Sequence, residues 1–597
     1  MKKLIVIVAL VVAAGVFWKF SGDADKTVNQ VDYSDHSDHL SLIPADTLFY
    51  MGGLEPVNAK DMMASMSSMY AFTDPAMLSA FNDEAFEKLA ADADSAGSKF
   101  ALGLFKFLLQ GLSDPQSMFA QTGAKETLFS SVYSVGLLPV IRYEADEARF
   151  DQFITRIEAD AQVAAVIKQA GAVSYRSYPL GNDDGKGLDL VVAYHGGDAI
   201  FTLAITGKGM DQNLQIALGD QAPQQSLRQA GTLEKLKGEY NYLPESLGYL
   251  SIQQTIAALT TSDNLAGQML AALDDNLESK LHKIRGPECA AEFADVAAVW
   301  PRWVMGYRSL DYGEHGFKGN FHMNMEINHP ALTDILKRLA GHLPADMMNE
   351  RRDIFSMAIG LDISKLDSVI GGLAQLAEGL QYQCEGLQGL NGMADAMHSA
   401  RPAVAMSTAM ARGVKGLRVS LYDIDGDLEK GDVTAVDALI SLSGDQVRAL
   451  LTTLMAMNPG AQMVAIPEDG SPVALPVPDE LLKGAAQQIR VMLAAKDSHA
   501  VAYTGETATE LSVAVLNEPA NADGLMAFSL DYGRYMSLFG SLMDAAAIDA
   551  EMTDQEKAEY ESFRKAIGNI DYREQMQMRF TDKGLEFDGY IEVNNDK

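Results

Sequence analysis

The chain has 597 residues, more than the roughly 250–300 residues at which a single hydrophobic core stops growing, so its length predicts two domains. Its apolar content of 48% is ordinary for a globular protein and excludes a wholly disordered chain. The formal net charge of −34 repels phosphate backbones and anionic surfaces, which argues against nucleic acid as a partner.

An apolar segment at the N-terminus predicts that the chain is inserted into the bacterial inner membrane or exported across it. Lys2 and Lys3 precede the charge-free apolar run 4–18, a pattern of signal anchors and signal peptides. As a helix this segment would span about 25 Å, against roughly 30 Å of hydrocarbon. We predict that residues 1–20 form a retained signal anchor, a single-pass transmembrane helix that holds the body in the periplasm. The alternative is cleavage near 22–24 and secretion into the periplasm.

Residues 21–40 are polar and predict a flexible linker between the membrane and the body. Within them, Asp35, His36, Asp38 and His39 offer two carboxylates and two imidazoles to a divalent metal. A linker lacks the rigid surroundings that hold metal ligands in place, so a polar spacer is the preferred interpretation.

The remainder of the chain repeats itself once. Short segments of the first half recur in the same order in the second half. The difference in residue number between matching segments decreases along the chain. Chance similarity gives no reason for this regularity, so we predict two homologous domains at residues 41–330 and 331–597. The clearest matching pairs are 43–46 with 343–346, 204–207 with 502–505, and 317–324 with 587–594.

Short apolar runs joined by turns predict antiparallel strands in both halves, and runs with helical spacing predict helices over one face. The expected fold class is α+β: two duplicated domains, each a mostly antiparallel sheet covered by helices, after one N-terminal transmembrane helix. The predicted strands are 48–51, 132–143, 188–194, 199–206, 355–359, 417–422, 438–442, 489–494, 499–504 and 511–515, with closing hairpins at 304–327 and 575–593. The predicted helices are 62–69, 86–91, 100–112, 147–168, 366–380 and 445–457.

The chain has two cysteines, Cys289 and Cys384, and they predict a disulfide. In an oxidising compartment a lone pair is more often bonded than used as a thiol site, and neither residue belongs to a CxxC motif. Neither cysteine has a counterpart in the other half of the repeat. We therefore expect the bridge to join the two halves across their interface.

The Pro44-Ala45-Asp46-Thr47 turn, the strand after it, and the strand–helix–strand–strand pattern over 143–217 resemble a family of uncharacterised bacterial envelope proteins. Members of that family begin with a membrane segment followed by this turn. The resemblance implies the architecture and a location in the cell envelope. It implies no activity, because the family has no settled activity to transfer.

Motifs of common catalytic sites are absent from the sequence. It contains no GxSxG, no HExxH and no GxxxxGK[ST], which argues against a nucleophile elbow, a zincin site and a phosphate loop. Carboxylates are so abundant that composition alone singles out no acid–base pair. We therefore nominate no catalytic and no cofactor-binding residue, and we expect no cofactor.

Asp423, Asp425 and Asp427 are the candidate calcium ligands, because their carboxylates alternate at short spacing around Gly426. In an EF-hand the glycine stands sixth and a glutamate twelfth, whereas here the glycine is fourth and Thr434 is twelfth. An acidic hairpin turn is the preferred interpretation, and calcium binding is the alternative.

Clustered methionine and histidine side chains raise copper binding as a further alternative, since thioethers and imidazoles bind Cu(I). If residues 304–327 form a hairpin, Met323 and Met325 share one face of a strand with Phe321, while His322 points to the other face. That arrangement separates the would-be ligands and favours core packing.

The function we expect is non-catalytic: a membrane-tethered periplasmic protein that binds an apolar ligand or a partner protein of the cell envelope. Its expected partners are the inner membrane, through residues 1–20, and an envelope protein or lipid, but no nucleic acid. One alternative is an envelope hydrolase with a carboxylate-based site. Another is a calcium or copper binding protein.

Overall fold

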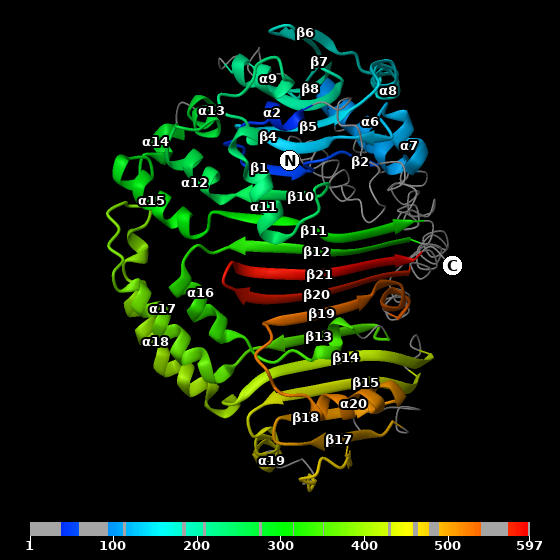
Figure 1. The fold of residues 1–597 in the computed structure, drawn as a ribbon, viewed down its shortest axis with the longest axis vertical. Coiled ribbons are helices and arrows are strands. Elements are labelled where there is room, and N and C mark those ends of the chain that lie inside the picture. The colour runs from blue at the N-terminus through cyan, green and yellow to red at the C-terminus, as the bar shows by residue number, and fades with distance from the viewer. Residues whose placement is uncertain are drawn as a thin grey trace. The chain divides into compact units, whose positions relative to one another are not determined.

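Tertiary contacts divide the chain into two compact units. Unit 1 comprises Met1–Glu326, Gln383–Leu387 and Val593–Lys597, and unit 2 comprises Ile327–Tyr382 and Gln388–Glu592. Both combine helices with antiparallel strands, which confirms the α+β class (Figure 1). The computed structural model describes residues 38–58, 93–111, 115–181, 187–206, 210–273, 277–313, 316–349, 352–427, 432–457, 464–476, 489–538 and 571–594.

The N-terminal predictions fall outside these ranges. Residues 1–37 and the predicted helices at 62–69 and 86–91 are not among the described residues. Within the described ranges, no helix is both long enough and apolar enough to cross a membrane. The end of the predicted linker is folded: α2 (His39–Leu42) buries His39 and Leu40 in unit 1.

The strands of unit 1 pair in the order β6-β7-β8-β9-β5-β4-β1-β10-β11-β12, and each pairing is antiparallel. A separate short pair joins β2 to β3. The strands are β1 (Phe49–Gly52), β2 (Val57–Asn58), β3 (Thr127–Leu128), β4 (Ser130–Val135), β5 (Leu138–Glu144), β6 (Val166–Ala170), β7 (Val173–Pro179), β8 (Leu188–His195), β9 (Asp198–Ile205), β10 (Leu247–Ser251), β11 (Arg302–Gly313) and β12 (Gly316–Glu326).

Several helices of unit 1 bury an apolar face, and α8 is a clear example. Phe150, Phe153, Ile154 and Ile157 recur at helical spacing and are all buried, and Asp146 caps the helix by accepting a hydrogen bond from the Arg149 backbone. Besides α2, the helices are α6 (Ala96–Gly111), α7 (Pro115–Gln121), α8 (Glu147–Asp160), α9 (Asp211–Leu218), α10 (Leu227–Ala230), α11 (Thr232–Tyr240), α12 (Ile252–Thr260), α13 (Leu265–Leu273), α14 (Leu277–Leu281) and α15 (Pro287–Val299).

In unit 2 the strands follow the order β16-β17-β18-β15-β14-β13-β19-β20, again antiparallel, and β21 closes the unit beside β20 (Figure 1). The strands are β13 (Phe355–Gly360), β14 (Val414–Asp427), β15 (Asp432–Gly444), β16 (Val473–Leu475), β17 (Val491–Ala495), β18 (His499–Thr504), β19 (Met526–Asp531), β20 (Asp571–Thr581) and β21 (Gly584–Asn594). The α-helices are α16 (Pro330–Leu336), α17 (Leu366–Ala377), α18 (Met393–Thr408), α19 (Val447–Met457) and α20 (Glu506–Asn517). The short 3-10 helices are η3 (Lys337–Leu339), η4 (Ala345–Met348), η5 (Ile363–Lys365), η6 (Gln388–Leu390) and η7 (Ala409–Ala411).

The two units order their strands in the same way. In unit 1, β1 lies between β4 and β10, and in unit 2, β13 lies between β14 and β19. Beyond β4 come β5, β9 and β8, as β15, β18 and β17 come beyond β14. A helix follows the inner strand in each case, α9 after β9 and α20 after β18. A common origin of the two units stays a prediction.

Three predicted elements are wrong in type or extent. The strand predicted at 132–143 is two strands, β4 and β5, because Gly136 turns the chain with a φ of +57°. The helix predicted at 147–168 ends at Asp160, and the edge strand β6 takes its last residues. The strand predicted at 511–515 lies inside α20, which buries Ala508, Leu511, Ser512 and Val515 at helical spacing.

Candidate functional site

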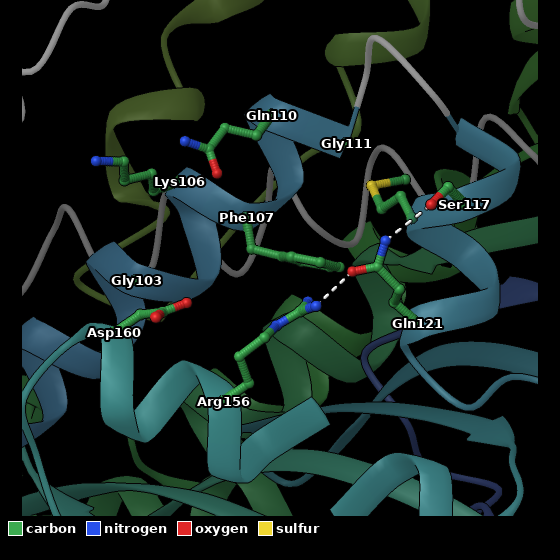
Figure 2. Close-up of a pocket in the computed structure, with 10 residues that line it drawn as sticks. Gly103, Lys106, Phe107, Gln110, Gly111, Ser117, Gln121, Arg156 and Asp160 are labelled. Atoms are coloured by element: carbon green, nitrogen blue, oxygen red, sulfur yellow. Dashed lines mark hydrogen bonds between the residues drawn. The ribbon is translucent and has the colours of Figure 1, made fainter. Parts of the chain in front are cut away.

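A groove of about 610 Å³ opens between α6, α7 and α8 of unit 1 (Figure 2). We call it the helical groove. It is lined by Gly103, Lys106, Phe107, Gln110, Gly111, Ser117, Met118, Gln121, Arg156 and Asp160. The lining therefore combines an aromatic ring and a thioether with cationic and amide side chains.

The side chains in the middle of the helical groove point toward one another from three helices (Figure 2). The Arg156 guanidinium carbon lies 4.9 Å from the centre of the Phe107 ring, which is within the range of a cation–π contact. Arg156 also donates a hydrogen bond to the side-chain oxygen of Gln121. Gln121 in turn donates to Ser117 Oγ at 2.8 Å, so a chain of hydrogen bonds links the guanidinium to α7.

Two glycines of α6 determine how closely the neighbouring helices approach. A Cβ added to Gly103 would lie 3.1 Å from the Ala161 Cβ, just beyond the end of α8. A Cβ added to Gly111 would lie 2.4 Å from Met118 of α7, which is closer than real side chains come. The small residues therefore allow the approach that brings Phe107 and Arg156 into contact.

A second arrangement of interest is a buried polar cluster in unit 2. His342, His499 and Glu518 each place one metal-ligating atom within 4.8 Å of those of the other two. His342 Nε2 lies 2.7 Å from Glu518 Oε1, and His499 Nε2 lies 2.9 Å from the Glu518 backbone oxygen. Both imidazoles are buried, and their ring centres are 5.1 Å apart. We call these three residues the His–His–Glu cluster.

Further polar groups hold the His–His–Glu cluster from outside. His342 Nδ1 lies 3.3 Å from Asp523 Oδ2, and His499 Nδ1 lies 2.9 Å from Ser443 Oγ. Burial, together with the neighbouring charge of His342, holds the pKa of His499 below its ordinary value. The imidazole of His499 is therefore neutral at neutral pH.

Unit 1 contains a comparable buried cluster built around a fixed cation. Arg142, which is 1% exposed, donates to Asp198 Oδ2 at 2.9 Å, to the Ala217 carbonyl at 3.0 Å and to Tyr133 Oη at 3.2 Å. His39 Nε2 lies 2.9 Å from the other oxygen of Asp198. His39, raised above as a metal ligand in a flexible linker, is instead bonded to a buried carboxylate.

The candidate calcium ligands all lie on β14. Asp423 and Asp425 are exposed, and the strand is irregular between Leu421 and Asp423 and between Asp425 and Gly426. Asp427 is the last residue of this strand. Asp423 Oδ1 accepts a hydrogen bond from the Ile424 backbone and lies 3.8 Å from Arg534. Calcium binding at Asp423, Asp425 and Asp427 stays a prediction.

The methionine and histidine side chains considered as copper ligands lie on opposite faces of β12, as the alternation along a strand predicts. His322 is fully buried on β12 and lies 2.7 Å from Tyr242 Oη. Met323 and Met325 are half-buried and alternate along the strand with buried His322 and Asn324. The thioethers therefore lie on the opposite face from the imidazole.

Cys289 and Cys384 form a disulfide, as predicted. Cys384 belongs to the short stretch Gln383–Leu387, which clusters with unit 1, although unit 2 supplies the chain on both sides of it. Glu292 of α15 fixes this stretch by accepting hydrogen bonds from the Gln383 and Cys384 backbones at 2.7 and 2.9 Å. The bridge therefore lies within unit 1, rather than across an interface between the units.

No protein-family model, curated protein or solved structure matches the chain. The family resemblance stays a prediction, and function has to be argued from the two sites themselves. Sequence reasoning identified neither the helical groove nor the His–His–Glu cluster. No spacing pattern marks the cluster in the sequence, because His342 and Glu518 are 176 residues apart.

Proposed function

We propose that the protein is a non-catalytic binding protein of the bacterial envelope, tethered by residues 1–20, whose helical groove takes an amphiphilic anion. The observation that carries this proposal is the Phe107–Arg156 contact inside an open groove. A cation placed over an aromatic ring offers an apolar surface and a positive charge at one point. An acyl chain with a carboxylate or phosphate head matches both.

The charge around the groove supports an anionic ligand. The described lining includes the cations Lys106 and Arg156 and the carboxylate Asp160, in a chain whose net charge is −34. Among the described residues, Arg156 forms no ion pair, and its hydrogen bond goes to the neutral amide of Gln121. A bound anion would therefore meet a guanidinium that is not paired with a carboxylate in the part of the chain that the structure describes.

The hydrolase alternative gains less support from the same surface. Such a site requires two carboxylates that converge on one substrate, and the described lining of the helical groove contains Asp160 alone. A second hollow, of about 430 Å³, includes Glu147 and Asp151. There Asp151 is engaged in an ion pair with Arg176, so it is not free to act as an acid or a base.

Binding of a dansyl-labelled fatty acid tests the proposed groove. We expect Arg156→Gln to weaken binding about tenfold, equivalent to about 1.4 kcal/mol, because the carboxylate loses its charged hydrogen-bond partner. Phe107→Ala is expected to weaken it as well, because the acyl chain loses an apolar wall. Fluorescence titration of the full chain in mild non-ionic detergent provides the measurement.

The matched control is Arg176→Gln, which removes a half-buried arginine of unit 1 that lies outside the groove lining. Its affinity for the labelled acid is expected to equal that of the wild-type chain. A neutral fatty alcohol is expected to displace the label less well than the acid of the same length. The helical groove would not be the binding site if Arg156→Gln and the wild-type chain bound the labelled acid with equal affinity. The same would follow if the alcohol and the acid displaced the label equally well.

The proposed tether is tested by the mass of the chain isolated from bacterial membranes. Retention of residues 1–20 predicts the full 64.5 kDa mass and extraction by detergent, but not by salt or alkali. A chain that starts near residues 22–24 and is found in the soluble periplasmic fraction would instead establish cleavage. That result would leave the binding activity of the groove to be judged by its own experiment.

A further inference from the structure

The His–His–Glu cluster and the Arg142 cluster occupy the same place in the strand order of their units. In unit 1, Glu144 of β5 pairs with Asp198 at the start of β9. In unit 2, Ser443 of β15 pairs with His499 at the start of β18. Arg142 stands two residues before Glu144, just as Ser441 stands two residues before Ser443, and residues two apart on a strand share a face. Ser441 is therefore the positional counterpart of Arg142.

In unit 2, a neutral serine therefore stands where unit 1 has a buried cation. In unit 1, the Arg142 guanidinium binds both Asp198 and the carbonyl of Ala217 in the last turn of α9. In unit 2, Glu518 stands at the corresponding end of α20. The Ser441 hydroxyl is buried and makes no hydrogen bond within the described part of the chain. The Glu518 carboxylate is instead partnered by the His342 imidazole, whose Nε2 lies 2.7 Å from Oε1.

We propose that the His–His–Glu cluster binds one Zn²⁺ ion, which fills in unit 2 the role that the Arg142 guanidinium has in unit 1. Two imidazoles and a carboxylate are ligands that Zn²⁺ prefers, whereas Ca²⁺ and Mg²⁺ prefer oxygen alone. Ligand atoms around tetrahedral zinc lie roughly 3.3 Å apart. The three candidate atoms already lie within 4.8 Å of one another, so small side-chain rotations suffice.

The groups around the cluster match those that position zinc ligands. A ligating histidine usually donates its second ring N–H to a carboxylate or another oxygen, which fixes the ring. Here Ser443 Oγ lies 2.9 Å from Nδ1 of His499. The Asp523 carboxylate lies 3.3 Å from Nδ1 of His342, which makes no hydrogen bond among the described residues, so a small rotation of the ring would be needed to form one. His342 Nε2 faces the Glu518 carboxylate, whereas His499 Nε2 lies beside the Glu518 backbone oxygen. The second carboxylate oxygen of Glu518 accepts a hydrogen bond from the Ala345 backbone at 3.4 Å.

Bound zinc would join the turn before Leu343 to two segments much later in unit 2, the first residue of β18 and the end of α20. Three protein ligands would leave the fourth tetrahedral position of the zinc to water or another small ligand. The site lies outside the helical groove and is independent of any ligand bound there.

The experiment is zinc titration of the full chain after treatment with a chelator and its removal. The wild-type chain is expected to bind one tight equivalent of Zn²⁺, with a rise in the calorimetric midpoint of unfolding. His342→Gln and Glu518→Gln are expected to lose that equivalent, with affinities lowered at least tenfold. Calcium at the same concentration is expected to compete poorly.

The matched control is His398→Gln, because His398 also lies beside a glutamate, Glu378 at 3.0 Å, but on the surface of unit 2. It is expected to keep the tight equivalent. As a second route, Ser441→Arg supplies the guanidinium that unit 1 uses and is expected to remove zinc binding without removing a ligand. The proposal is overturned if the wild-type chain binds no tight equivalent, or if His342→Gln and Glu518→Gln retain it.

Discussion

Arg142→Met is expected to destabilise unit 1 by about 3–5 kcal/mol, because it leaves a buried carboxylate without its main cationic partner. Arg142 and Asp198 are each 1% exposed, so water cannot replace the lost guanidinium. The variant also leaves the Ala217 carbonyl and the Tyr133 hydroxyl without their donor. Denaturant unfolding followed by tryptophan fluorescence measures the loss, because Trp300 and Trp303 both belong to unit 1.

The control for this experiment is Arg176→Met, in which the arginine is 23% exposed and pairs with Asp151 and Glu158. An ion pair with that much solvent contact is worth no more than about 1 kcal/mol, so the free energy of unfolding is expected to change little. If the two variants lose equal stability, burial of the Arg142 cluster has no special energetic role.

The stability of unit 1 should also depend on pH through Asp198. Burial alone would raise the pKa of this carboxyl, but the hydrogen bonds and charges of His39 and Arg142 outweigh burial and hold its pKa below the ordinary value. Asp198 therefore stabilises the folded state above the ordinary aspartate pKa of about 4, and that contribution is lost as the pH falls through the lowered value. The stability difference between wild type and Arg142→Met is expected to shrink in the same acidic range.

Removing the disulfide with Cys289→Ala and Cys384→Ala together is expected to lower the stability of unit 1 by about 2–5 kcal/mol. The bridge joins residues 95 apart in sequence, so it restricts a long loop in the unfolded chain. Glu292 retains its hydrogen bonds to the Gln383 and Cys384 backbones, so we expect the Gln383–Leu387 stretch to stay docked in the folded state. Denaturant unfolding with and without reductant provides the measurement.

Reductant distinguishes the bridge from side-chain packing in this experiment. It is expected to lower the unfolding midpoint of the wild-type chain to that of the double variant, and to leave the double variant unchanged. If reductant has no effect on the wild-type midpoint, the bridge contributes nothing to stability. If the double variant is less stable than the reduced wild type, the difference measures the packing lost with the two sulfur atoms.

The sequence predicted correctly those strands and helices whose own residues show a clear apolar or turn pattern. β18 was predicted over its full length, and β11 and β12 were predicted as a hairpin, because apolar residues and turn glycines mark them clearly. The strand predicted at 511–515 is wrong because a short apolar run fits a strand as well as a helix. The burial of Ala508, upstream of that run, reveals the helical spacing of α20.

The two candidate sites depend on contacts between residues that are far apart in sequence, which short sequence patterns cannot reveal. The helical groove requires α6 and α8 to approach closely at Gly103, although Phe107 and Arg156 lie far apart in sequence. The His–His–Glu cluster joins His342 to Glu518 across a separation of 176 residues. No spacing rule connects such residues, because the strand order of unit 2 decides which of them meet.

The bridge between Cys289 and Cys384 also alters how the chain would carry a mechanical load. Tension applied between points of the chain before Cys289 and after Cys384 would pass through the two sulfur atoms instead of the backbone between them. That backbone includes β11, β12, β13, α16 and α17, none of which would be stretched while the bridge is intact. The 95 residues that separate the two cysteines correspond to roughly 310–340 Å of fully extended chain. This length could extend under load only after the bridge is reduced.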